Sequence, residues 1–296
     1  MASPAPGVLS HQTNIPVRER RSFSTVPRVR TGDGSAGDAD YGRIGAGYRT
    51  YRQPEPEFQA AIDAALGTAR SVLNVGAGAG SYEPQDREVT AVEPSASMRA
   101  QRPAALSAAI DATAENLPFA DDSFDAAMAT FSVHQWSNLE AGLAELRRVS
   151  RGPVVILTCD PTLVTRFWLY QYAPAVLDTE ARRYPAIDRI VAGLGGTVSC
   201  TNLPIPLSCV DGFGEAYYGR PELLLDPGAR LANSAWSFVD QNTADGYVAA
   251  LQGALADGSW DRAYGRLRRQ AHFEGSPVLV VAQPTRPVAV GRPAAR

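Results

Sequence analysis

Short apolar runs alternate with helical patterns along most of this chain. Runs of the length and composition of buried strands occupy residues 72–75, 89–92, 108–110, 124–130, 154–159, 197–205 and 278–282. Apolar residues with the spacing of one helix face lie between them, as at Leu139, Leu143, Leu146 and Val149. Strands that alternate with helices predict an α/β fold with a mostly parallel sheet and helices on both of its faces.

The same pattern divides the chain into five predicted segments. Residues 1–39 are rich in Pro, Ser, Gly and Arg and have no helix or strand period, which predicts a flexible arm, either solvated or wrapped around a second subunit of a homo-oligomer. Residues 40–206 form the core, 207–274 a helical insert, 275–284 the final core strand and 285–296 a tail. The aromatic residues of the insert fit a lid over the strand ends, which we favour, or simply the core of the insert.

The stretch SVLNVGAGAGSYEP, residues 71–84, is a buried strand that runs into a glycine loop. Gly76, Gly78 and Gly80 lack Cβ atoms, so a ligand can lie against bare backbone. The residues before the next strand include Pro84 and are too few for a full helix, which argues against a pyrophosphate at a helix N-terminus. The lysine of a P-loop is missing as well.

Composition removes several classes of function. The net charge is −3, whereas nucleic-acid-binding surfaces are normally basic, so we expect no nucleic-acid partner. The sequence contains no lysine, which excludes a lysine Schiff base and conventional pyridoxal phosphate chemistry. Three cysteines without a C-x-x-C pair argue against disulfides and zinc. We expect a cytoplasmic protein that does not contact a membrane, since no apolar run is long enough to span one.

Three motifs together resemble the class I S-adenosylmethionine-dependent methyltransferases, and in particular their small-molecule branch. They are the glycine loop after a strand, Glu93 at the end of the next strand, and DATAENLPFADDSFDAAMATFSVHQWSN. The resemblance covers about residues 40–160 and departs from the family at Asn74, where an acid is commonest. It implies a Rossmann-like sheet of seven strands, the last antiparallel, with the helical insert between strands six and seven. It also implies S-adenosyl-L-methionine as cofactor, S-adenosyl-L-homocysteine as product, no metal, and a small organic acceptor such as those of natural product biosynthesis.

The resemblance also implies which residues bind the cofactor. Glu93 would accept hydrogen bonds from the ribose hydroxyls, and Asp111 would accept one from the adenine amino group. The alternatives are that Glu93 stabilises a helix start, that Asp111 belongs to an ordinary turn, and that the N-terminal tyrosines only pack on the core. The full predicted set is Gly76, Gly78, Gly80, Glu93, Pro94, Met98, Asp111, Ala112, Thr130, Phe131, Tyr41, Tyr48 and Arg52.

His134 is the candidate general base for an acceptor that loses a proton. It follows the fourth predicted strand in FSVHQW, and an imidazole can accept a proton near neutral pH. The other interpretation is a structural histidine stacked on Trp136. We expect His134, Trp136, Tyr217 and Tyr218 to contact the substrate, with Tyr217 or Tyr218 as further candidate bases.

Three other functions fit the same motifs less well. One is a cofactor-dependent cyclase or rearrangement enzyme, which would use the cation without consuming it. Another is a non-catalytic cofactor-binding protein that acts in assembly through its arm. A nicotinamide-dependent reductase is the best alternative among enzymes with a related fold.

Overall fold

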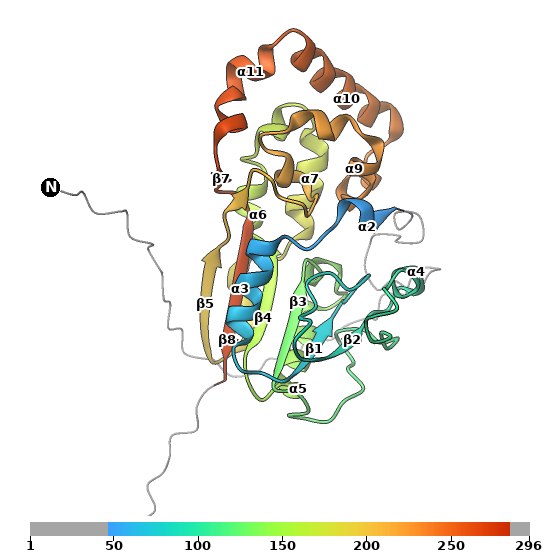
Figure 1. Cartoon of the computed structure of the whole chain (residues 1–296), viewed down its shortest axis with the longest axis vertical. Helices are drawn as coiled ribbons and strands as arrows, with labels where there is room; N and C mark the ends of the chain where they lie inside the picture. The colour runs from blue at the N-terminus through green and yellow to red at the C-terminus, as the bar shows by residue number, and fades with distance from the viewer. Residues whose placement is uncertain (1–46, 285–296) are drawn as a thin grey trace, which may run out of the picture.

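The computed structural model describes residues 47–284, so the predicted arm, Tyr41 and the predicted tail lie outside it. A sheet of six strands, in the order β2-β1-β3-β4-β8-β5, forms the core (Figure 1). Strands β1 to β4 pair in parallel, and β8 is antiparallel to both of its neighbours. The predictions of a Rossmann-like α/β fold and of an antiparallel last strand are therefore confirmed. The strands are β1 (Ser71–Val75), β2 (Glu88–Val92), β3 (Ala126–Thr130), β4 (Val154–Cys159), β5 (Thr197–Asn202) and β8 (Pro277–Gln283).

Alternate residues of the central strands enter different hydrophobic clusters because successive side chains of a strand point to opposite faces. In β4, Val155 and Leu157 join one cluster, while Val154 and Ile156 join the other. The first cluster packs against α3 (Pro56–Leu66), and the second against α5 (Leu139–Val149) and α8 (Ile187–Leu194). Both faces of the sheet are therefore covered, as a parallel sheet requires.

Side-chain caps fix where several of the helices begin. Asn138 accepts a hydrogen bond from the Ala141 backbone N–H at the start of α5, and Ser95 accepts one from Met98 at the start of α4 (Ala96–Ala100). Asp240 does the same at α10 (Gln241–Ala256).

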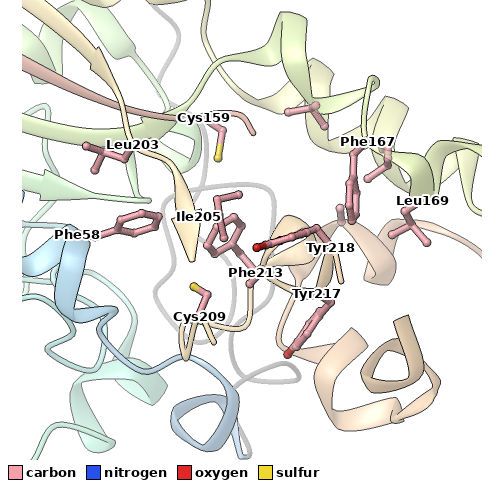
Figure 2. Close-up of a cluster of buried hydrophobic side chains, with 14 of the residues drawn as sticks. Phe58, Cys159, Phe167, Leu169, Leu203, Ile205, Cys209, Phe213, Tyr217 and Tyr218 are labelled. Atoms are coloured by element: carbon pink, nitrogen blue, oxygen red, sulfur yellow. The ribbon is translucent and has the colours of Figure 1, made fainter. Parts of the chain in front are cut away.

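Two parts of the chain, residues 161–183 after β4 and residues 207–271 after β5, form a helical layer beyond the strand ends (Figure 1). A small ribbon of β6 (Ile205–Pro206) and β7 (His272–Phe273) closes its base. Figure 2 shows Phe213 and Tyr218 of this layer in one cluster with Phe58 of α3, so the layer and the core share a single hydrophobic interior. No helix in residues 47–284 is both long and apolar enough to cross a membrane. The remaining elements are α2 (Tyr48–Tyr51), η1 (Val133–Gln135), α6 (Pro161–Val164), η2 (Trp168–Gln171), α7 (Pro174–Arg183), η3 (Gly214–Tyr217), η4 (Pro221–Leu225), α9 (Pro227–Leu231), η5 (Ser234–Phe238), α11 (Ser259–Tyr264) and η6 (Gly265–Arg269).

Three predicted strands are shorter in the structure, and one of them, predicted at 124–130, begins at Ala126. The strand expected at residues 108–110 is reduced to a single parallel bridge between Ile110 and Val92, so the described sheet has six strands and not seven. Ile110 is exposed at the sheet edge, where little apolar surface favours pairing. The strand expected at 197–205 ends at Asn202, just before Pro204, which has no N–H for the ladder.

A buried ion pair between Arg102 and Glu83 packs next to the glycine loop. Arg102 makes two hydrogen bonds of 2.9 Å to the Glu83 carboxylate, and both side chains are almost fully buried. Asn74, in the middle of β1, donates its amide to the same carboxylate at 3.0 Å. An acid is commonest at the position of Asn74 in the family that the sequence resembles, and in this chain the carboxylate that contacts this position comes from Glu83, nine residues later.

Replacing Glu83 should destabilise the fold strongly. Glu83→Ala leaves the Arg102 guanidinium buried without its partner, so we expect the free energy of unfolding in urea to fall by about 3–5 kcal/mol. Glu140→Ala is the control because it removes an exposed ion pair with Arg189, which is worth less than about 1 kcal/mol. Equal effects of the two substitutions would contradict this account of the loop.

Candidate functional site

A deep cavity lies at the carboxyl ends of the parallel strands β1, β2 and β3. It measures about 880 Å³, including its open mouth. Ligands of open α/β sheets bind at this edge. The cavity is lined by the glycine loop, the end of β2, the segments before and after β3, α2 with its flank, and one residue beyond β6: Tyr48, Arg52, Gly76, Ala77, Gly78, Ala79, Ser81, Tyr82, Glu93, Pro94, Met98, Ala114, Glu115, Thr130, Phe131, Ser132, Gln135, Trp136 and Asp211.

The glycine loop forms the floor of this first cavity in a conformation that few other residues adopt. Gly76 and Gly78 have φ values of +69° and +52°. A Cβ on Gly76 would lie 2.6 Å from the Cβ of Ser132, so a larger residue does not fit without displacing β3's end. Gly80 also has positive φ, but its missing Cβ makes room for Leu106, and Gly80 does not line the cavity.

Glu93 joins the glycine loop to the end of β2. Its carboxylate accepts 2.8 Å hydrogen bonds from the backbone N–H groups of Gly78 and Ser95. The side chain is largely buried and lines the cavity beside Pro94 and Met98. The structure thus brings together the predicted glycines and the predicted acid, in a geometry that holds a carboxylate at the edge of a ligand-sized space.

The segment after β2 lines the cavity three residues later than the sequence analysis expected. Asp111 and Ala112 are not in the lining, and Ala114 and Glu115 are. The Asp111 side chain is half exposed and pairs with Arg99 at 3.3 Å, on the outside of the site. Glu115 is thus the acid of DATAENLPF that lines the cavity, and a contact between Asp111 and the cofactor stays a prediction that the cavity lining does not support.

An ion pair between Arg52 and Asp211 lines the first cavity on the side of the helical layer. Asp211 is 2% exposed and also accepts a 2.8 Å hydrogen bond from the Tyr82 hydroxyl. The Arg52 guanidinium lies over the rings of Tyr48 and Phe131, at 5.5 and 5.6 Å from their centroids. Three segments distant in sequence therefore meet at one charged contact.

Two residues that line the first cavity hold strained backbone. Tyr82 and Phe131 have φ values of +63° and +47°, a region that costs a bulky residue about 1–3 kcal/mol. Strain of this kind persists only where surrounding contacts impose it, and it is common at ligand sites. Here it turns both rings toward the cavity wall, with their centroids 6.3 Å apart.

A second cavity of about 440 Å³, its mouth included, adjoins the first. The two share Tyr48, Arg52 and Phe131, so only these side chains separate them. The other lining residues come from η1, α7 and the helical layer: His134, Glu180, Arg183, Tyr184, Phe213, Ala232, Asn233 and Ser234. This second cavity is small, aromatic and charged, unlike the glycine-floored first one.

His134 lines the second cavity. Its ring lies 4.6 Å from the ring of Tyr184, centroid to centroid, and not on Trp136 as the structural alternative supposed. Its Nδ1 atom is buried without a hydrogen-bond partner among residues 47–284. Burial and the positive charges of Arg183 and Arg52 hold the pKa of His134 well below 6.5. The imidazole is therefore neutral at physiological pH.

The remaining predicted substrate residues separate into two groups. Trp136 lines the first cavity, where Gly142 leaves room for its ring. Tyr217 and Tyr218 line neither cavity. Tyr218 stacks on Phe273 with centroids 5.1 Å apart and donates a 2.6 Å hydrogen bond to the Gln270 carbonyl. Both tyrosines belong to the interior shown in Figure 2.

Several lining residues escaped the sequence analysis. Asp211 lies far from the motifs, and nothing in its local sequence marks it as the partner of Arg52. Glu180 and Arg183 stand on the polar face of an ordinary amphipathic helix. Tyr82 could have been predicted from the sequence, since it belongs to the glycine loop segment, residues 71–84. Within the described residues no cluster of three or more His, Cys, Asp or Glu side chains suits a metal ion.

Residues 73–156 match the sequence model of a protein family described as "Methyltransferase domain". The structure is similar to a protein of Anabaena variabilis ATCC 29413 assigned as a methyltransferase from an antibiotic biosynthesis pathway. The two share 28% sequence identity with a TM-score of 0.74, over 78% of this chain and 98% of that one. No curated protein sequence matches the chain significantly.

Two more distant solved structures share only the general outline. One is a Thermotoga maritima protein assigned as an S-adenosylmethionine-dependent methyltransferase, with 14% identity and a TM-score of 0.49, over 82% of this chain and 95% of that one. The other is the [4+2]-cyclase SpnF, with 16% identity and a TM-score of 0.43, over 77% of this chain and 80% of that one. Neither likeness bears on the chemistry of this chain.

The His134 imidazole should resist protonation. We expect its NMR signal, assigned by its loss in His134→Gln, to titrate well below pH 6.5. The unfolded chain binds this proton near pH 6.5 and the folded chain does not, so this histidine destabilises the fold as the pH falls below 6.5. A signal that titrates at or above pH 6.5 would show that the ring is not enclosed beside the two arginines.

Proposed function

We propose that this chain, a class I S-adenosylmethionine-dependent methyltransferase, transfers the methyl group of that cofactor to a small organic metabolite. The observation that carries the proposal is the pair of adjoining cavities, one with a glycine floor and a carboxylate edge, the other aromatic and charged. The first suits the cofactor and the second suits a compact acceptor. The similarity to a protein assigned to antibiotic biosynthesis supports a natural-product acceptor.

The residues of the first cavity fit S-adenosylmethionine. Gly76 and Gly78 line the cavity with backbone alone, and Glu93 offers a carboxylate for two ribose hydroxyls. The amide of Gln135 is buried in the lining with both of its polar atoms unpaired among the described residues, as is the indole nitrogen of Trp136. Buried polar atoms of this kind call for a polar ligand.

When bound, the sulfonium supplies an already activated methyl group, so the protein has mainly to orient and to exclude water. Tyr48, Phe131 and Tyr82 present aromatic surface at the junction of the cavities, which favours a cationic centre. Arg52 stands there too, but Asp211 neutralises it, so the junction does not repel the cofactor. Alignment of the two reacting groups accounts for about 7–11 kcal/mol of barrier reduction in favourable cases.

The second cavity would hold the acceptor, with the helical layer between β4 and β8 acting as its lid. Phe213, Asn233 and Ser234 of this layer line it, so the acceptor would be enclosed between layer and core. His134 would contact the acceptor through its neutral imidazole, and its unpartnered Nδ1 suits such a contact. A hydroxyl, amine or carbon acid would each satisfy this arrangement.

Calorimetric titration and product analysis test the proposal. S-adenosylhomocysteine should bind with a stoichiometry of one and in preference to NADH, and it should accumulate with turnover when S-adenosylmethionine and acceptor mixtures are supplied. Preferential binding of NADH would refute the proposal. Turnover of an acceptor without S-adenosylhomocysteine would instead favour a cyclase or rearrangement enzyme.

Glu93 and Asp111 should differ sharply as cofactor ligands. Hydrogen bonds to a charged group are worth about 1.5–3 kcal/mol, so Glu93→Ala should raise the Kd of S-adenosylhomocysteine by about tenfold to a hundredfold. Asp111→Ala should leave it within about twofold, because Asp111 lies outside the cavity. Calorimetry measures both constants, and a larger loss in Asp111→Ala would reverse the assignment.

A further inference from the structure

Two charged side chains of the second cavity have no role in the proposal so far. Glu180 and Arg183 lie three residues apart on α7, so they share one face of the helix, and both line the cavity. The Glu180 carboxylate also faces Gly214, whose missing Cβ would lie 4.0 Å from one of its oxygens. Arg183 donates a 2.8 Å hydrogen bond to the Ser234 hydroxyl and lies 4.8 Å from the ring centroid of Phe238.

These groups give the cavity a positive bias. Burial lowers the pKa of His134, and the positive charges of Arg183 and Arg52, which line the same cavity, lower it further. The same two arginines act on Glu180, but its enclosure in the protein outweighs them and raises its pKa. The Glu180 carboxylate is therefore a stronger proton acceptor than an exposed carboxylate.

A positive, aromatic cavity selects among possible acceptors. Tyr48, Phe131, Tyr184 and Phe213 present flat rings, which suit a flat conjugated acceptor. Because Asp211 neutralises Arg52, it is the Arg183 guanidinium that disfavours a bound ammonium ion and favours a bound oxyanion. A carboxylate acceptor is already ionised and would meet Glu180 as a like charge. An acidic hydroxyl satisfies both groups, because it donates to Glu180 first and leaves an oxyanion for Arg183 afterwards.

We propose that the acceptor is a flat phenol or enol, that Glu180 accepts its hydroxyl proton, and that Arg183 stabilises the oxyanion that attacks the methyl group. This inference rests on the proposed methyl transfer and identifies its acceptor class. Glu180 takes the place of His134 as the base because it shares one face of α7 with Arg183, so the proton acceptor and the cation that meets the oxyanion stand side by side in the cavity. His134 then orients the hydroxyl through its ring nitrogen.

The step balances without any further reagent. The hydroxyl proton moves to a Glu180 oxygen, and a lone pair of the acceptor oxygen forms the new O–CH₃ bond. The S–CH₃ bond breaks with its electron pair left on sulfur, so the sulfonium becomes a neutral thioether. The products are the methyl ether, S-adenosylhomocysteine and protonated Glu180, which returns its proton to solvent.

Binding of 4-nitrophenol to the complex with S-adenosylhomocysteine tests the charge field directly. The phenolate absorbance gives the pKa of the bound phenol, which we expect to be lower than in water by about 1. Arg183→Gln should abolish most of this difference, whereas Arg182→Gln should preserve it, because Arg182 is exposed on the same helix outside the cavity. A bound phenol with an unchanged or raised pKa would overturn the inference, as would a failure to bind.

Turnover tests the proton acceptor. With 4-nitrophenol or catechol as acceptor, Glu180→Gln should lower kcat near pH 7 by about a hundredfold or more, and the loss should shrink to about tenfold or less at a pH where the free phenol is ionised. Asp178→Asn on the same helix is the control and should keep the wild-type pH profile. The charged and titratable groups that face Glu180 are Arg183, Arg52, Tyr184, Cys159 and Glu215, and all are intact in both variants.

The outcomes separate the two proposals. Methylation of benzylamine or benzoate in preference to both phenols, or an equal loss in Glu180→Gln at every pH, would overturn the acceptor assignment while methyl transfer stands. Failure of the wild-type protein to bind S-adenosylhomocysteine would overturn the methyltransferase proposal itself.

Discussion

The buried carboxylate of Asp211 is the contact on which the two cavities depend. A charge this deeply enclosed costs several kcal/mol unless it is paired and hydrogen-bonded. Arg52 supplies the opposite charge and Tyr82 supplies a hydroxyl, and each belongs to a different part of the chain. The flank of α2, the glycine loop and the helical layer are thereby held in one arrangement, and this arrangement forms the boundary between the first and second cavities.

The same ion pair explains how a cationic cofactor and two arginines can share one site. Arg52 is neutralised at the junction, so the positive field that acts on the second cavity comes mainly from Arg183. Glu93 and Glu115 line the first cavity together with this paired arginine, whereas Arg183 lines only the second cavity. A cationic methyl donor would therefore meet carboxylates, and an acceptor in the second cavity would meet the Arg183 guanidinium.

Much of the fold follows from local pattern. The β4 boundaries, the alternation of strands and helices and the glycine loop were predicted because each depends on neighbours in sequence. Asp125 lies at the opposite end of the sheet from the cavities, where it accepts hydrogen bonds from the Arg70 and Ser71 backbone. A strand was predicted at residues 108–110, where the structure has a single bridge at Ile110, because periodicity does not reveal how exposed the edge of the sheet is.

The parts of the site that sequence did not reveal are those made by distant contacts. Asp211, Glu180 and Arg183 are ordinary polar residues until the helical layer folds back over the core. Tyr217 and Tyr218 illustrate the converse, since an aromatic pair in a predicted lid proved to be interior packing. Glu115 lines the first cavity and Asp111 does not. Both acids lie in an irregular segment, where no helix or strand period predicts which side chain faces the cavity.

The position of β8 has a consequence for how the chain folds. β8 is the last strand of the described chain, yet it lies between β4 and β5 in the interior of the sheet. Neither β4 nor β5 can complete its backbone pairing until the whole helical layer has been synthesised and its ends have met at β6 and β7. Such long-range closure gives a high contact order and slow folding. The enclosed acceptor site and the finished core therefore form together, late in folding, and a nascent chain that stops before β8 exposes two unpaired strand edges to aggregation.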